Sequence, residues 1–135
     1  MQAAVTRMSA LKGRHILVVE DEALIALDLQ RLLDQSGAMV IGPAVSVSQA
    51  LEAIHENHID FALLDIKLGD ETVDPVAAVL AQRAIPTIFV TAYGDGRLPP
   101  GFETHPMIEK PYAEDQLLNL IGSIFSQTGS PTDSA

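Results

Sequence analysis

The chain has 135 residues, the length of one domain, and its 18 acidic against 8 basic side chains give a formal net charge of −10. This acidic balance disfavours nucleic acids and anionic membranes as partners. The absence of cysteine excludes disulfides, thiol catalysis and cysteine-based zinc sites. No apolar run approaches the ~20 residues that span a bilayer, and the opening MQAAVTRMSALKGRH lacks the apolar stretch of a secretory signal. We therefore expect a single-domain cytoplasmic protein.

Short, uninterrupted apolar runs recur along the chain and predict its strands. The runs are Ile16 to Val19, Met39 to Ile41, Phe61 to Leu64, Ile88 to Val90 and the weaker Met107-Ile108. They do not alternate apolar with polar residues. Such runs are typical of strands that are covered on both faces, as in a parallel sheet.

Helical patterns follow the first two runs. Apolar residues at i, i+4, i+7 and i+8 predict an amphipathic helix from Glu22 to Gln35, which Gly37 ends. Ser46 and Gln49 match a capping box at the start of a second helix.

Two further helices and one gap follow the third run. Asp74 and Pro75 are expected as the N-cap and first residue of a third helix, and an apolar stripe from Leu117 to Phe125 predicts the last one. Between them, Ala92 to Thr104 reads AYGDGRLPPGFET, with three glycines and a proline pair that a helix interior does not tolerate. We expect a loop there, or at most one helical turn.

The alternation of strands and helices predicts an α/β fold. It favours a doubly wound, flavodoxin-like, five-stranded parallel sheet of order 2-1-3-4-5, in which the fourth helix is short or disordered. We place the domain at residues 14–126, between a flexible N-terminal extension, 1–13, and a flexible tail, 127–135.

Ligands of such sheets bind beyond the carboxyl ends of the strands, where the strand order reverses. The first and third strands meet there and end in Glu20, Asp21 and Asp65. Two carboxylates about 4 Å apart repel by about 4 kcal/mol at an effective dielectric of 20, so we expect a divalent cation between them. Oxygen-only ligands favour Mg²⁺. Thr91 and Lys110 add a hydroxyl and a cation, which suits phosphoryl transfer to a carboxylate nucleophile.

Four motifs occur in the expected order along the chain. The segments VVEDE at 18–22, LLDIKLGDE at 63–71, IFVTAYGD at 88–95 and EKPY at 109–112 resemble the receiver domain of two-component response regulators. The resemblance covers about residues 14–126. It implies that Asp65 accepts a phosphoryl group from a sensor histidine kinase or a phosphotransfer protein.

The resemblance also implies roles for the residues around Asp65. Glu20 and Asp21 would hold Mg²⁺ together with Asp65, and Lys67 would contribute its backbone carbonyl to the metal. Thr91 and Lys110 would contact the phosphoryl oxygens. A receiver promotes its own phosphorylation and dephosphorylation, so the resemblance implies a signalling protein rather than an enzyme acting on other substrates.

The sequence departs from the common receiver pattern on its fifth strand. Most receivers carry an aromatic switch residue three positions before the lysine, where this chain has Met107. Several segments, among them IFVTAYGD and RAIPTIF, are similar to the FAT GUY receivers, a mainly bacterial subgroup that often stands alone and is associated with HWE-type or related histidine kinases. Tyr93 then becomes a candidate substitute for the missing aromatic residue.

Structural interpretations compete at several of these positions. Asp21 alternatively caps the first helix, and Thr91 is alternatively an ordinary β-branched strand residue. His55 and His58 are spaced i, i+3 near a helix end, where we expect solvated side chains and no metal site, and His15 is expected to be structural or exposed.

Three functions remain open from the sequence. The first is a phosphorylated receiver that signals by binding an unidentified downstream protein or by shuttling phosphate. The second is a receiver-like binding module that is never phosphorylated. The third, a metal-dependent phosphatase, is disfavoured because the acid/base Asp expected two residues after Asp65 is replaced by Lys67.

Overall fold

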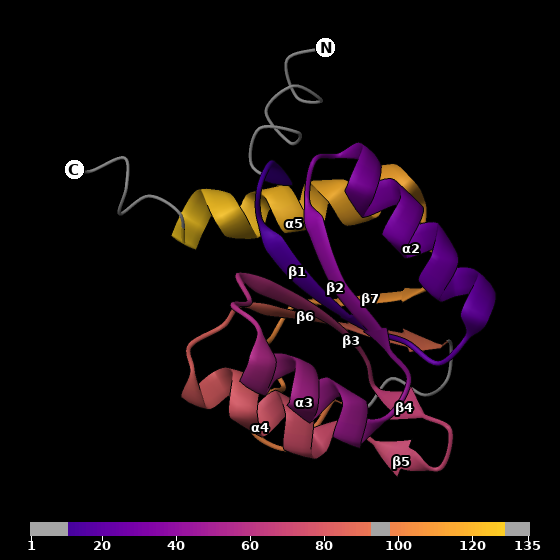
Figure 1. Cartoon of the computed structure of the whole chain (residues 1–135), viewed down its shortest axis with the longest axis vertical. Helices are drawn as coiled ribbons and strands as arrows, with labels where there is room; N and C mark the ends of the chain where they lie inside the picture. The colour runs from indigo at the N-terminus through magenta and orange to yellow at the C-terminus, as the bar shows by residue number, and fades with distance from the viewer. Residues whose placement is uncertain (1–10, 93–97, 129–135) are drawn as a thin grey trace.

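The computed structural model describes residues 11–92 and 98–128 (Figure 1). Its main sheet contains five strands: β1 (His15–Val19), β2 (Met39–Ala44), β3 (Phe61–Asp65), β6 (Thr87–Ala92) and β7 (Met107–Lys110). All neighbouring strands are parallel, and their order is β2-β1-β3-β6-β7. Counted along the chain, this is the predicted order 2-1-3-4-5, so the doubly wound flavodoxin-like fold is confirmed.

The helices cover both faces of this sheet. They are α2 (Ala23–Gln35), α3 (Val47–Glu56), α4 (Asp74–Gln82) and α5 (Glu114–Thr128). Figure 1 shows α2 and α5 on one face and α3 and α4 on the other. None of the helices in the described residues has the length and hydropathy that a bilayer crossing requires.

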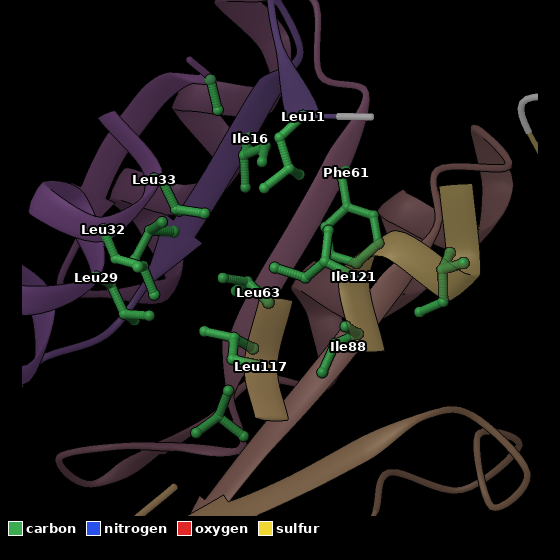
Figure 2. Close-up of a cluster of buried hydrophobic side chains, with 14 of the residues drawn as sticks. Leu11, Ile16, Leu29, Leu32, Leu33, Phe61, Leu63, Ile88, Leu117 and Ile121 are labelled. Carbon is green, nitrogen blue, oxygen red and sulfur yellow. The ribbon is translucent and has the colours of Figure 1, made fainter. Parts of the chain in front are cut away.

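Successive strand residues pack into two different cores. Ile16 and Leu63 lie in the core under α2 and α5, where Figure 2 shows them with helix residues such as Leu117, while Leu17 and Leu64 lie in the core under α3 and α4. Neighbouring residues of a strand point to opposite faces, so a sheet covered on both sides needs apolar residues at every position. All five residues of β3 are accordingly buried.

Local signals set where the helices begin and end. The Ser46 Oγ accepts a hydrogen bond from the Gln49 N–H at 3.2 Å, and the Gln49 side chain accepts one from the Val45 N–H at 3.0 Å. The predicted capping box therefore forms, except that the Gln49 side chain accepts from Val45, the residue before the N-cap, and not from the N-cap Ser46 itself. Gly37 follows α2 with a φ of +90°, a backbone conformation that glycine adopts without steric cost.

The start of α4 differs from the prediction by one residue. Val73, not Asp74, is the N-cap, and it makes no side-chain capping bond. Val73 is fully buried in the core under α3 and α4, which fixes the point where the chain turns into the helix. Asp74 is instead the first helical residue, where its charge interacts favourably with the helix dipole.

The loop after β3 contains a small hairpin that the sequence patterns did not predict. Strands β4 (Lys67–Leu68) and β5 (Glu71–Thr72) pair antiparallel around Gly69, which has a φ of +58°. Leu68 is buried in the core under α3 and α4. The hairpin is therefore anchored beside the carboxyl end of β3.

Of the stretch expected as a loop, Ala92 to Thr104, the structure describes Ala92, which instead ends strand β6, and residues 98–104. Residues 98–104 form turns and no helix, as predicted. Leu98 and Phe102 pack against the core under α3 and α4, and the Phe102 ring lies 5.7 Å from that of Phe89. These apolar contacts attach the described part of the loop to the sheet.

Leu11 lies within the stretch 1–13 that the sequence analysis set apart from the domain, yet its side chain is fully buried among the residues of Figure 2. At the other end, α5 continues to residue 128, past the proposed boundary at 126. Residues 1–10 and 129–135 lie outside the described part of the chain.

The edge strand β2 contains an irregularity opposite β1. The register between the two strands shifts between Leu17 and Val19. Gly42 has a φ of +102°, and a Cβ there would lie 2.7 Å from the Ala44 nitrogen and 2.8 Å from the Val18 carbonyl oxygen. Only glycine fits such a position, and Pro43 follows it within the strand.

Candidate functional site

The carboxyl ends of the central strands surround a cavity of about 240 Å³. It is lined by Asp21, Glu22, Asp65, Ile66, Lys67, Gly69, Thr91, Ala92 and Lys110. These residues follow or end β1, β3, β6 and β7, together with the β4–β5 hairpin. The fold therefore brings Asp21, Asp65, Thr91 and Lys110 to one place, as the motif positions predicted.

Lys110 contacts three carboxylates from the end of β7. Its Nζ lies 3.0 Å from Asp65 Oδ2, 3.0 Å from Glu20 Oε1 and 2.6 Å from Glu22 Oε1, and its side chain is 11% exposed. Burial alone would lower the pKa of Lys110, but the hydrogen bonds to these carboxylates outweigh it and raise the pKa above its usual range. The ammonium therefore stays charged at neutral pH.

Glu20 is the most buried of the carboxylates at this end of the sheet, with 1% of its surface exposed. Burial, with the neighbouring Asp65 adding to it, raises the pKa of Glu20 to about 7 against the opposing hydrogen bond from Lys110. Its Oε2 also accepts a hydrogen bond from the Glu22 N–H at 3.1 Å. Glu20 thus changes its charge near neutral pH.

Oxygen ligands for a metal ion lie together here. Glu20, Asp21 and Asp65 each offer a carboxylate oxygen, and these atoms lie within 4.8 Å of one another. Glu22 adds a fourth carboxylate, and Lys110 contacts three of the four, so the cluster attracts cations. Oxygen-only donors with a net negative charge fit a hard ion, and Mg²⁺ takes few carboxylates beside water and phosphate oxygens.

Asp21 does not cap the helix that follows it. The N-cap of α2 is Glu22, which makes no side-chain capping bond. The Asp21 Oδ2 instead accepts a hydrogen bond from the Gly69 N–H at 2.8 Å, across the cavity in the β4–β5 hairpin. The alternative interpretation of Asp21 as a helix cap is therefore wrong.

Lys67 and Thr91 take different positions around Asp65. The Lys67 backbone N–H donates to Asp65 Oδ1 at 3.2 Å, and its side chain is exposed. Thr91 is 1% exposed, and its hydroxyl donates to the carbonyl oxygen of Ala92 at 3.2 Å. Asp65 thus has one oxygen hydrogen-bonded by a backbone N–H and the other by the Lys110 ammonium.

The two switch candidates have different outcomes. Met107 begins β7 opposite Phe89, and its side chain is 41% exposed. At the position of the usual switch aromatic, this chain therefore presents an apolar methionine side chain to solvent. Tyr93 lies outside the described residues, so its role stays a prediction.

Glu22 belongs to the site and Tyr112 lines the neighbouring cavity, although the sequence analysis assigned neither of them a role. Glu22 was predicted as a helix residue, yet its carboxylate contacts Lys110; the signal was the run of three carboxylates in VVEDE. Burial raises the pKa of Tyr112 to about 12. Tyr112 follows the Lys110–Pro111 peptide, which is cis, and lines a second cavity of about 490 Å³ between α2 and the start of α5.

Comparison with known proteins identifies the family. The response regulator receiver domain matches residues 16–122. The phyllosphere-induced regulator PhyR of Methylorubrum extorquens is 36% identical over 110 residues, which cover 78% of this chain and 41% of that protein. This chain spans less than half the length of the curated relatives it matches.

Solved structures agree with this result. The solution structure of SdrG from Sphingomonas melonis Fr1 matches with a TM-score of 0.69 and 36% identity, covering 82% of this chain and 98% of that one. The receiver domain of PhyR from Erythrobacter litoralis matches with a TM-score of 0.69 and 31% identity, covering 84% and 91%. These neighbours are consistent with the FAT GUY resemblance. The chain belongs to the response regulator receiver domain family.

Proposed function

We propose that Asp65 accepts a phosphoryl group from a histidine kinase, of the HWE or a related type, or from a phosphotransfer protein. The phosphorylated chain then signals by binding another protein or by passing the phosphoryl group on. The observation that carries this proposal is the contact between Asp65 and Lys110, 3.0 Å apart, at a cavity shared with Glu22, Asp21 and Thr91.

In this reaction a carboxylate oxygen of Asp65 attacks the phosphorus of the donor phosphohistidine in line with the leaving nitrogen. The P–N bond breaks, its electron pair returns to the imidazole, and an acyl phosphate forms on Asp65. Mg²⁺ held by Glu20, Asp21, Asp65 and the Lys67 carbonyl would neutralise charge on the transferring group.

Lys110 and Thr91 act on the product side of the transfer. The Lys110 ammonium, already in contact with Asp65, neutralises a phosphoryl oxygen. The Thr91 hydroxyl exchanges its hydrogen bond to the Ala92 carbonyl oxygen for one to the phosphoryl group. The same groups stabilise the transition state for attack by water, so the chain also promotes its own dephosphorylation.

A protein donor is supported by the surface of α2 beside the site. Leu24 and Leu27 are 79% and 62% exposed, three residues apart on the helix that begins next to the cavity. Adjacent exposed leucines on one helix face are a feature of protein-binding surfaces. We therefore propose that the phosphodonor docks against α2.

The proposal is tested by incubating the chain with acetyl phosphate and Mg²⁺ and measuring its mass, and by following beryllofluoride binding by NMR. We expect an added phosphoryl group on the wild type and none on Asp65→Asn. The matched control is Asp70→Asn, which makes the same substitution at an exposed position of the neighbouring hairpin and should be modified like the wild type.

Either of two results would refute the proposal. An adduct of equal yield on Asp65→Asn would place the chemistry on another residue. Failure of both reagents on the folded wild-type chain would favour the alternative function, a receiver-like binding module that is never phosphorylated.

A further inference from the structure

A second cluster of metal-ligating side chains lies at the opposite end of the sheet. His15 begins β1, and Asp60 immediately precedes β3, the neighbouring parallel strand. The Asp60 N–H donates to the His15 carbonyl oxygen at 2.8 Å, and the His15 N–H donates to Asp60 Oδ2 at 2.8 Å. Two backbone-anchored contacts therefore fix these residues side by side.

His58 completes the cluster from the loop between α3 and β3. Its Nε2 lies 2.8 Å from Asp60 Oδ1, and its ring lies 5.5 Å from that of His15 at an angle of 78°. Ile59, between His58 and Asp60, is buried in the core. Burial of the middle residue directs its two neighbours toward the same side, and this places both next to His15.

The donor atoms have separations that suit a tetrahedral metal ion. The His15 Nδ1 lies 3.5 Å from Asp60 Oδ2, and one donor atom from each of the three residues lies within 4.8 Å of the others. Zinc bonds to imidazole nitrogen and carboxylate oxygen are close to 2.0–2.2 Å, so tetrahedral donors lie about 3.3–3.6 Å apart. Small rotations of the side chains would therefore suffice.

One donor of the cluster faces Asp60 Oδ2 at 3.5 Å without a hydrogen bond of normal geometry, although the His15 side chain as a whole is 34% exposed. Within the described residues, His15 Nδ1 is a buried side-chain nitrogen that makes no hydrogen bond. Leaving such a group unsatisfied costs about 1–3 kcal/mol, so native structures seldom keep one without a reason. The His58 side chain is 73% exposed, so an ion can reach it from solvent.

We propose that His15, His58 and Asp60 form a binding site for a divalent transition-metal ion, with Zn²⁺ as the best match. Two imidazoles and one carboxylate are ligands of borderline softness, unlike the oxygen-only set at the other end of the sheet. Three protein ligands leave a fourth position for water. This proposal is independent of phosphorylation at Asp65.

The structure also revises what the sequence indicated about these histidines. The i, i+3 spacing drew attention to His55 and His58, for which no metal site was expected. His55 is exposed and does not belong to the cluster. The partner of His58 is His15, which lies far away in the sequence and is brought close by the register of β1 and β3.

The experiment titrates the full chain with ZnCl₂ in excess Mg²⁺ and follows it by calorimetry and amide NMR. We expect one ion per chain, with the largest shifts at His15 and at residues 58–60. His58→Ala should weaken binding by at least about tenfold, the smallest loss usual even for indirect supporting contacts. The matched control, His55→Ala, removes a neighbouring exposed histidine and should bind like the wild type.

Two further measurements keep the test decisive. Co²⁺ should give the intense visible absorption of tetrahedral coordination in the wild type and His55→Ala, and lose it in His58→Ala. His58 is largely exposed, so its alanine variant should keep the wild-type circular dichroism spectrum. Equal zinc affinity of His58→Ala and the wild type, or shifts confined to Glu20, Asp21 and Asp65, would overturn the proposal.

Discussion

The two ends of the sheet are built on the same strands but carry different chemistry. Strand β3 alone separates Asp60 at its amino end from Asp65 at its carboxyl end. The carboxyl end gathers carboxylates and one lysine, whereas the amino end gathers two imidazoles around one carboxylate. A parallel sheet thus brings residues together at both ends, and the residue types beside each strand decide what each end binds.

Glu20 and Asp60, one carboxylate at each end, also differ in their acidity. Burial raises the pKa of Glu20 to about 7, with Asp65 adding to the effect against Lys110. Burial alone would likewise raise the pKa of Asp60, but the His15 N–H and the His58 side chain outweigh it and lower that pKa. The comparison shows that burial sets the direction of the shift at Glu20, whereas hydrogen-bond donors set it at Asp60.

The largest effect is expected for a substitution in the middle of β3, the strand that connects the two ends. Phe61 is fully buried in β3, and its ring lies 5.1 Å from that of Phe125. We expect Phe61→Ala to lower the free energy of unfolding by about 3–5 kcal/mol and to impair both ends together. Urea unfolding measures this, with the exposed Leu27→Ala as the control. Loss at one end alone would show that the ends are built separately.

A smaller effect should be confined to the carboxyl end. Lys110→Met leaves buried acceptors on Glu20 and Asp65 without their ammonium donor, which should cost about 1–3 kcal/mol of unfolding free energy. The pKa of Glu20 should rise further. Lys67→Met, at an exposed side chain, is the control. Altered amide shifts at His15 and Asp60 in Lys110→Met would contradict the separation of the two ends.

The most local expected effect is a pH dependence that belongs to Glu20 alone. Its folded pKa of about 7 exceeds its ordinary value of 4.5, so the folded chain binds more protons between these pH values. In Mg²⁺-free buffer, the contribution of Glu20 to stability should be fully present below pH 4.5 and be lost as the pH rises through 7, by about 3 kcal/mol at most. Glu20→Gln should flatten this part of the curve. An unchanged slope in that variant would assign the titration to another group.

Patterns that repeat along the chain predicted most of the fold. The apolar runs located the five strands because both faces of the sheet are covered, and Ser46 with Gln49 marked the start of α3. The strand ends then indicated which side chains would meet at the carboxyl edge. These signals are local, or follow from the order of strands, so one sequence suffices to find them.

Contacts that depend on three-dimensional register could not be predicted in this way. Strands β4 and β5 have two residues each, too few to show periodicity. Glu22 fits a helical pattern as well as it fits a contact with Lys110, which is far away in the sequence. His15 and His58 meet only because β1 and β3 pair in one particular register.

The irregular edge strand β2 has a consequence for assembly. An exposed strand edge is a template on which further strands can add, and this leads to aggregation. Pro43 removes one N–H donor from β2, and the shifted register beside Gly42 breaks the even spacing that another strand would need. Growth by sheet extension is thereby disfavoured at this edge, so copies of the chain should not join by adding strands to β2.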